Sequence, residues 1–226
     1  MLPKNIRDLR YRAFYGLLLR RGYPLETLCA PGSICPWTIC TAGLNSQSIV
    51  YSAGVGSDIS FEHELVKKFR CRIVLIDPSP TGVKTMSLPE NKIPEFTHYP
   101  VALAGRNGAL NFALLDPKGD SWFAQQESPA KHEVPCTDLQ SLMKQNGHDH
   151  IDFLKLDIEG CEYEVIEDVL QRRLPVAQIA VEYHHGIVPG ITRGQTIRSM
   201  LSLIVRGYKL LCQEGANHTF FRAVRN

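Results

Sequence analysis

The sequence predicts an α/β fold in which a mostly parallel sheet is covered by helices on both faces, giving three layers. Strand and helix patterns alternate along the chain, and each strand is nearly continuous in apolar residues. Such runs are typical of parallel strands that are buried on both faces. At the C-terminal end two strand patterns follow each other with no helix between them, which predicts an antiparallel strand at the edge of the sheet.

The first half of the chain supplies three strands and one helix of this pattern. Residues 49–55 form an apolar strand, and Asp58 is the expected N-cap of the helix that follows. Residues 72–80 form a second strand that ends at prolines, and residues 96–103 form a third. Residues 108–115 are expected as a small added strand or hairpin arm. The inward face of the helix is formed by Phe61, Leu65, Val66 and Phe69.

The second half continues with a helix over residues 137–147, a strand over 151–159, a helix over 163–173 and a strand over 178–184. The helix over 137–147 and the last helix of the chain, which ends at Gly207, each begin at a predicted capping box. The boxes are Thr137 with Gln140 and Thr192 with Gln195, and the predicted stops are Gly147 and Gly207. The last helix is expected to bury Ile197, Met200, Leu201 and Ile204. Two strands around a turn at Ala216-Asn217 close the chain.

Residues 46–226 are therefore predicted to form one domain, and residues 1–45 an N-terminal extension that packs on it. Residues 116–135 are expected as a long surface loop, a type of loop that is often functional. The chain has 226 residues, of which 44% are apolar and 21% charged, as in ordinary globular proteins. A formal net charge of +2 gives no reason to expect a nucleic-acid partner.

The apolar runs and the cysteines predict the cellular compartment of the protein. No run approaches the roughly 20 apolar residues of a membrane span, and the N-terminal stretch is too charged for a signal peptide. Of the seven cysteines, Cys29, Cys35 and Cys40 match no common metal spacing. We expect reduced thiols and a cytoplasmic protein, with a disulfide or metal clip among these three cysteines as the alternative.

Ligands of open parallel sheets bind beyond the carboxyl ends of the strands, and polar residues gather at those ends in this sequence. Gly54 and Gly56 lack a Cβ and let the backbone approach a ligand closely. Asp77 ends the next strand, about 20 residues later, where an acid that binds a ribose diol is expected. The alternative is that the glycines only turn the chain and Asp77 caps a loop.

Asp58 decides between two kinds of nucleotide ligand. A dinucleotide places its pyrophosphate at the N-terminus of the first helix, where the charge of Asp58 would repel it. A cationic sulfonium ligand with an amino-acid tail would be tolerated there. The sequence therefore favours an adenosyl sulfonium cofactor over a nicotinamide dinucleotide.

A second group of ionisable residues follows the later strands. Lys155, Asp157 and Glu159 share one parity on a strand and point the same way if the strand stays regular. Glu182 and His184 end the next strand. A carboxylate and a histidine at this edge could deprotonate a hydroxyl, and the same side chains could hold a divalent metal. A lysine–carboxylate cluster that only closes the sheet edge is the alternative.

The segment "IDFLKLDIEGCEYEVIEDVL" resembles the signature of the FkbM-type methyltransferases, with "VYSAGVGSDISFE", "VLIDPSP", "VALAGRNGALNF" and "AVEYHHG" in the expected order around it. The resemblance implies a class I methyltransferase, Rossmann-like fold with a seven-stranded sheet. It also implies S-adenosylmethionine as methyl donor and a hydroxyl of a sugar, polyketide or similar metabolite as acceptor.

By position, the resemblance implies that Gly54 and Gly56 form the cofactor turn, that Asp77 binds the ribose, and that Asp157, Glu159 and Gly160 form the signature strand end. Pro78, Ala102 and Asp157 are included among the expected cofactor-binding residues. Many members of the family have an acid where this chain has Ser52, and a glycine where it has Asp58. Asp58 and Glu62 therefore become the candidates for the group that holds the methionine ammonium, beside Ser52.

Our hypothesis for catalysis is that Asp157 or His184 is the base and that Glu182 and Glu159 orient it. A divalent metal is possible, but no metal ligand is assigned. The predicted partner is a small-molecule or glycan acceptor. The alternatives are a nicotinamide-dependent oxidoreductase, an inactive Rossmann-like binding or interaction protein, and a methyltransferase for protein or nucleic acid. No Asn/Asp-Pro-Pro-Tyr/Phe sequence follows the fourth strand, which argues against methylation of base amino groups.

Overall fold

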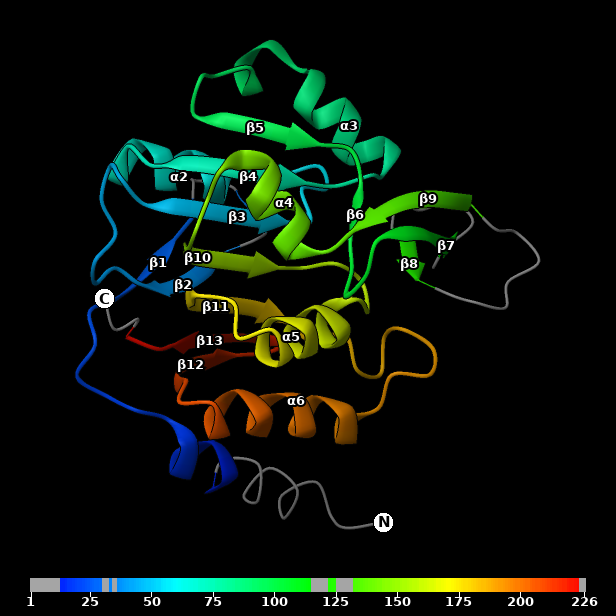
Figure 1. The fold of residues 1–226 in the computed structure, drawn as a ribbon. Coiled ribbons are helices and arrows are strands. Elements are labelled where there is room, and N and C mark those ends of the chain that lie inside the picture. Colours follow the sequence, from blue (N-terminus) through cyan, green and yellow to red (C-terminus); the bar gives the residue numbers. More distant parts are fainter. Residues whose placement is uncertain (1–12, 30–32, 34–35, 115–121, 125–131, 224–226) are drawn as a thin grey trace.

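The computed structural model describes residues 13–29, 33, 36–114, 122–124 and 132–223 (Figure 1). Seven strands form the main sheet in the order β12-β13-β11-β10-β3-β4-β5. Their bounds are β3 Ile49–Ala53, β4 Arg72–Ile76, β5 Phe96–Tyr99, β10 Ile151–Leu156, β11 Val176–Glu182, β12 Lys209–Glu214 and β13 Asn217–Phe221. The predicted seven-stranded, mostly parallel sheet is confirmed. The antiparallel strand β13 lies one place in from the edge, because β12 pairs with its outer side.

Helices cover both faces of this sheet, so the three-layer prediction is confirmed (Figure 1). Alternate residues of each strand enter opposite cores: Tyr51 packs with one layer of helices and Val50 with the other. The first layer contains α4 (Leu139–Asn146), α5 (Glu162–Gln171) and α6 (Arg193–Val205). The second contains α2 (Ser60–Phe69) and α3 (Pro80–Ser87), which a short 3₁₀ helix, η1 (Pro89–Asn91), follows.

A two-stranded hairpin from the predicted N-terminal extension completes the second layer. It consists of β1 (Leu25–Leu28) and β2 (Trp37–Cys40). The side chain of Gln178 in β11 joins it to the sheet, because its amide accepts from the Cys40 N–H at 2.6 Å and donates to the Cys40 carbonyl at 3.1 Å. Cys40 is buried here and Cys29 is exposed, whereas Cys35 lies outside the described residues. The domain boundary at residue 45 stays a prediction.

A small four-stranded sheet lies beside the carboxyl edge of the main sheet, in the order β6-β9-β7-β8. Its strands are β6 Ala102–Leu103, β7 Gly108–Leu114, β8 Trp122–Ala124 and β9 His132–Thr137. Two predictions are corrected by it. The strand expected over 96–103 divides, because its first part pairs with β4 and its last part with β9. The loop expected over 116–135 contains β8 and most of β9, and its other residues lie outside the described part of the chain.

Two predicted helix starts are wrong. Asp138, not Thr137, caps α4, and its carboxylate accepts from the Ser141 N–H at 2.7 Å. The N-cap of α2 is Ile59, and Asp58 instead accepts from the Ser60 N–H at 2.9 Å, just before the first full turn. Two other predicted helix ends are confirmed. Thr192 and Gln195 form the capping box of α6, and Gly147 is left-handed after α4. Along α6, Leu203 is buried in place of the exposed Leu201.

Among the residues that the structure describes, no helix is both long and apolar enough to cross a bilayer. Residues 13–18 are helical and pack beside α6, as Figure 1 shows. Tyr15 of this helix is buried, and its hydroxyl lies 2.8 Å from Nε2 of His218 in β13. Nδ1 of His218 lies 2.7 Å from the Ala216 carbonyl and must donate to it, so Nε2 accepts from Tyr15.

Replacing Tyr15 by phenylalanine should lower the free energy of unfolding by about 1–2 kcal/mol, because His218 Nε2 loses its donor inside the core. Urea unfolding followed by circular dichroism measures this change. Tyr23→Phe is the matched control, since that hydroxyl only accepts from Lys209 at the surface; it should change stability by less than about 0.5 kcal/mol. Equal effects of the two substitutions would contradict the anchoring role of Tyr15.

Candidate active site

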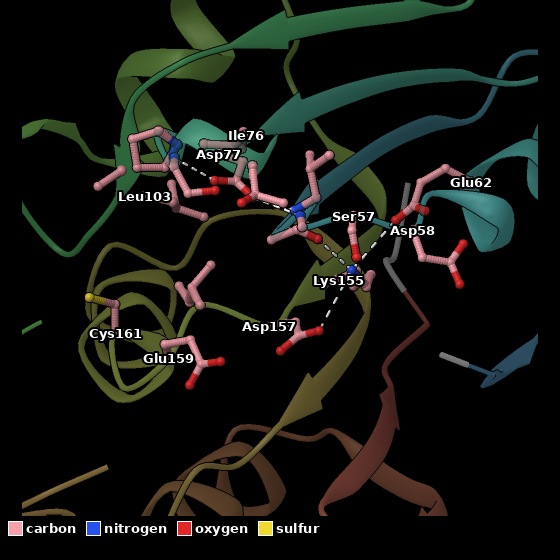
Figure 2. Close-up of a pocket in the computed structure, with 18 of the residues that line it drawn as sticks. Ser57, Asp58, Glu62, Ile76, Asp77, Leu103, Lys155, Asp157, Glu159 and Cys161 are labelled. Carbon is pink, nitrogen blue, oxygen red and sulfur yellow. Dashed lines mark hydrogen bonds and ion pairs between the residues drawn. The ribbon is translucent and has the colours of Figure 1, made fainter. Parts of the chain in front are cut away.

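A cavity of about 290 Å³ opens at the carboxyl ends of β3, β4 and β10, where the strand order reverses (Figure 2). This is the place at which open α/β sheets bind ligands. The structure brings most of the predicted site residues to its wall. They are Gly54, Gly56, Asp58, Glu62, Asp77, Pro78, Ala102, Asp157 and Glu159. Ser52 is fully buried behind Glu62, and Glu182 and His184 stand next to Asp157 rather than on the wall.

The glycine turn is shaped by the close approach of β3 and β10. Gly54 has a φ of 91°, and a Cβ placed on it would overlap the carbonyl oxygen of Asp157. Only glycine satisfies both the positive φ and this approach. Gly56 also has a positive φ of 55°, but a Cβ there would meet nothing within 4 Å. The first glycine is therefore required by the neighbouring strand, whereas the second leaves open space at the cavity wall.

Asp77 holds the turn from the end of the next strand. One of its carboxylate oxygens accepts from the backbone N–H groups of Val55 at 2.8 Å and Gly56 at 2.9 Å. The other accepts from the Ser79 N–H at 2.7 Å. A carboxylate offers about four acceptor positions, so one position on the second oxygen is left for a ligand. Whether a ribose uses it stays a prediction.

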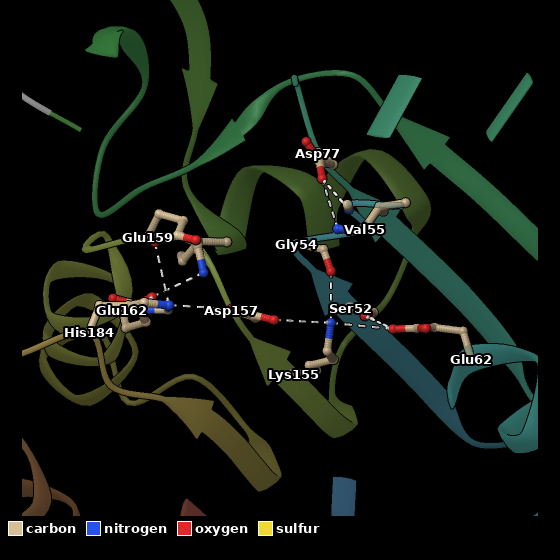
Figure 3. A network of polar contacts seen from close by, with 12 residues as sticks. Ser52, Gly54, Val55, Glu62, Asp77, Lys155, Asp157, Glu159, Glu162 and His184 are labelled. Carbon is tan, nitrogen blue, oxygen red and sulfur yellow. Dashed lines mark hydrogen bonds and ion pairs between the residues drawn. The ribbon is translucent and has the colours of Figure 1, made fainter. Parts of the chain in front are cut away.

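Lys155 is a buried cation of the site. In the sequence it stands out only because it points to the same side of the predicted strand as Asp157. Its ammonium donates to the Gly54 carbonyl at 2.7 Å and lies 3.5 Å from Glu62 and 4.0 Å from Asp157. The ring of Trp37 lies 5.3 Å from it. Lys155 thus connects the glycine turn with carboxylates on both sides, as Figures 2 and 3 show.

The two acids predicted to hold a methionine ammonium differ in what they already contact. Glu62 is 1% exposed and accepts from the Ser52 hydroxyl at 2.5 Å. Asp58 accepts from the Ser60 N–H and from the Ser33 hydroxyl at 2.9 Å. Both line the cavity. Ser52 therefore acts on the cavity only through Glu62. Position 52 itself carries no acid, and Glu62 places a carboxylate next to it.

A second polar network lies beyond Asp157, built around the fully buried Glu162 (Figure 3). Glu162 accepts from the N–H groups of Ile158 at 3.0 Å and Gly160 at 2.9 Å, and it lies 2.8 Å from Nδ1 of His184. The regular strand ends at Leu156, and Glu159 has a φ of 50°. The expectation that a straight strand aligns Lys155, Asp157 and Glu159 is therefore wrong for Glu159, which reaches the site from a tight turn.

Burial and mutual attraction shift the ionisation of this network. Burial lowers the pKa of His184, but its contact with Glu162, with Glu159 and Asp157 adding to it, raises the pKa overall to about 9. Burial raises the pKa of Glu159 to about 6, although the neighbouring His184 opposes that change. Burial also raises the pKa of Glu182, and the charge of Asp157 adds to this. The carboxylates around His184 outnumber its one imidazole, so their combined negative charge would attract a further cation.

Four contributors to the site are missed by sequence reasoning. Trp37 comes from the predicted N-terminal extension, and Phe112 and Leu103 come from the small sheet. Glu162 follows the predicted strand end and has the pattern of an ordinary residue in a first helical turn. One sequence feature could have indicated this role of Glu162. A glutamate shortly after a glycine at a strand end can accept hydrogen bonds from the free N–H groups of the turn.

The strand order, the antiparallel strand next to the edge and the site at the reversal point are those of a class I methyltransferase, Rossmann-like fold. A family model described as the methyltransferase FkbM domain matches residues 41–210. The chain therefore belongs to the FkbM methyltransferase family, and S-adenosylmethionine is its cofactor. Comparison with curated proteins found no matching sequence.

Solved structures similar to this chain include a precorrin-6y C5,15-methyltransferase from Geobacter metallireducens GS-15, with 13% identity, 80% of this chain and 82% of that chain covered, and a TM-score of 0.45. A human methyltransferase 10 domain containing protein shares 11% identity over 100% of this chain and 85% of that one, with a TM-score of 0.46. M. jannaschii TYW2 in complex with AdoMet shares 11% identity over 91% and 90%, with a TM-score of 0.39.

Replacing Gly54 by alanine should lower the free energy of unfolding by about 3 kcal/mol or more, because the new Cβ overlaps β10 and the backbone is strained at this φ. Gly56→Ala is the matched control, with a similar sign of φ but open space around the Cβ. It should cost about 1 kcal/mol. Thermal and urea unfolding measure both, and a Gly54→Ala protein as stable as Gly56→Ala would show that the two strands separate easily.

Proposed function

We propose that this protein transfers the methyl group of S-adenosylmethionine to a hydroxyl oxygen of a small molecule or glycan. The observation that carries the proposal is a shared cavity wall. The carboxylates of Asp157 and Glu159 line the same cavity as the glycine turn and Asp77. A proton acceptor and a cofactor turn then face the same cavity, as the transfer requires.

The residues of the cavity fit the cofactor. Asp77 keeps an acceptor position for a ribose hydroxyl, and the open space at Gly56 allows a ligand to approach the backbone. Asp58 and Glu62 lie on the wall toward α2, where their charges would attract the methionine ammonium. Apolar side chains of Leu103 and Phe112 from the small sheet offer a surface for the adenine.

The transfer itself needs alignment and one proton acceptor. The oxygen of the acceptor forms a bond to the methyl carbon while the bond from that carbon to the sulfonium sulfur breaks, and its electron pair stays on sulfur. The hydroxyl proton passes to Asp157 or Glu159, the two predicted catalytic carboxylates that reach the cavity. Glu182 and His184 stand behind Asp157 and orient it.

A hydroxyl acceptor suits this site because carboxylates surround the place where its proton must go. A protein acceptor is the alternative function, since the cavity wall includes the exposed residue Ser57. The formal net charge of +2 gives no electrostatic reason to favour a nucleic-acid acceptor. Assays with metabolite, glycan and protein fractions separate these acceptor classes.

Asp77→Asn should weaken S-adenosylmethionine binding at least tenfold, because one accepting oxygen becomes an NH2 group. That group cannot accept from the backbone N–H groups on its side, nor from a ribose hydroxyl. Isothermal titration calorimetry measures the dissociation constant. Asp149→Asn is the control, since that carboxylate is 93% exposed and remote from the cavity. Unchanged binding in Asp77→Asn would remove Asp77 from the cofactor site.

Asp157→Asn and Glu159→Gln should each lower turnover, and the one that removes the proton acceptor should lower it by about 10²–10⁴-fold. Transfer of a labelled methyl group to metabolite and glycan fractions gives the readout, with cofactor binding by calorimetry as the folding and binding control. If both variants keep full turnover on an identified acceptor, neither carboxylate is the base. If the label enters protein alone, the proposed acceptor class is wrong.

A further inference from the structure

A group of three potential ligands stands next to the cavity at the ends of two neighbouring parallel strands. Asp157 follows β10, and Glu182 and His184 end or follow β11. One carboxylate oxygen from each acid and one ring nitrogen of His184 all lie within 4.8 Å of one another. Parallel neighbours place these ends side by side, so the fold itself creates the group.

The imidazole of His184 has one ring nitrogen held by the protein and the other available for an external ligand. Its side chain is 5% exposed, and Glu162 fixes Nδ1 at 2.8 Å. Nε2 makes no hydrogen bond to any described residue. It points between Asp157 Oδ1 at 3.6 Å and Glu159 Oε2 at 3.5 Å. These separations are longer than charge-assisted hydrogen bonds, which are about 2.7–2.9 Å.

Glu159 gives the second indication of a missing partner. Its Oε2 atom is buried and has no hydrogen-bond partner. A buried carboxylate oxygen without a partner costs free energy. A cation bound to Nε2 of His184 would satisfy that nitrogen and place a positive charge beside Oε2 of Glu159. A carboxylate that holds the other ring nitrogen is the usual support for a metal-binding histidine. Glu162 provides that support.

We propose that Asp157, Glu182 and His184 bind a divalent metal ion, with Glu162 holding the imidazole in position. One nitrogen and two or more carboxylate oxygens suit Mn²⁺, Zn²⁺ or Mg²⁺, and not a soft cation such as Cu⁺. The proposal deepens the proposed function and rests on it for its purpose. Because Asp157 and Glu159 line the cavity, a cation here would bind the acceptor oxygen and favour its deprotonation.

The acceptor class follows from this placement. An alcohol that offers a second oxygen nearby, such as a vicinal diol or a hydroxy acid, would bind the cation through both oxygens. Asp157 would then be a ligand, and Glu159 would be left to take the proton. The methyl acceptor is therefore an oxygen chelator rather than an isolated hydroxyl.

The test measures Mn²⁺ binding to the whole chain by the loss of the free Mn²⁺ signal in electron paramagnetic resonance. The wild-type protein should bind one ion per chain, and His184→Ala and Glu182→Gln should each weaken binding at least tenfold. His150→Ala, at a half-exposed side chain, and Glu90→Gln, at an exposed one, are matched controls and should bind as the wild type does. Zn²⁺ and Mg²⁺ are then added as competitors for the same site.

Calorimetry with S-adenosylmethionine on the same variants separates this proposal from the proposed function. Glu182 and His184 do not line the cavity, so cofactor binding should persist when Mn²⁺ binding is lost. Cofactor binding without any Mn²⁺ binding at millimolar concentration would overturn the metal site and leave the methyltransferase proposal standing. Mn²⁺ binding that both variants retain would also overturn it. If a variant fails to fold by circular dichroism, the wild-type stoichiometry and the conservative His184→Gln variant decide.

Discussion

The ends of the two central strands depend on one buried carboxylate. Glu162 has no exposure to solvent and accepts from two N–H groups of the turn after β10 and contacts the histidine after β11. A carboxylate removed from water is costly unless donors surround it, and here they come from two different segments. The turn and His184 are therefore ordered together. The same contacts hold Glu159 at a φ that a non-glycine residue rarely adopts.

This network is coupled to the cofactor turn through the neighbouring strands. The backbone of Gly54 lies against the carbonyl of Asp157, and Lys155 reaches from the same strand to the Gly54 carbonyl. Any movement of the strand end thus reaches the glycine turn directly. The side chains that would receive a proton and the backbone that would hold the cofactor are thus joined by direct contacts, as preorganisation of a transfer site requires.

The sequence predicts those parts of the molecule that depend on local patterns. Continuous apolar strands, Gly54 with Gly56, and acids at strand ends are visible without the fold, and they locate the edge at which the cavity lies. Other contributors depend on contacts between distant segments. Trp37 reaches Lys155 from a separate hairpin, and β9 contains Pro135, which is unfavourable in a strand and conceals it. The cap of α4 shifts by one residue because Asp138 competes with Thr137 for the same role.

The distribution of charge explains how a cationic cofactor in the cavity and a metal ion next to it can lie close together. Lys155 already places a buried ammonium between the two regions, so two further positive centres would repel it and each other. Asp157 separates them, since one oxygen faces Lys155 and the other faces His184. Glu62 balances the cofactor side, and Glu159 and Glu182 balance the other. The acids at these strand ends are therefore more numerous than a single proton transfer needs, and this excess is what a second cation requires.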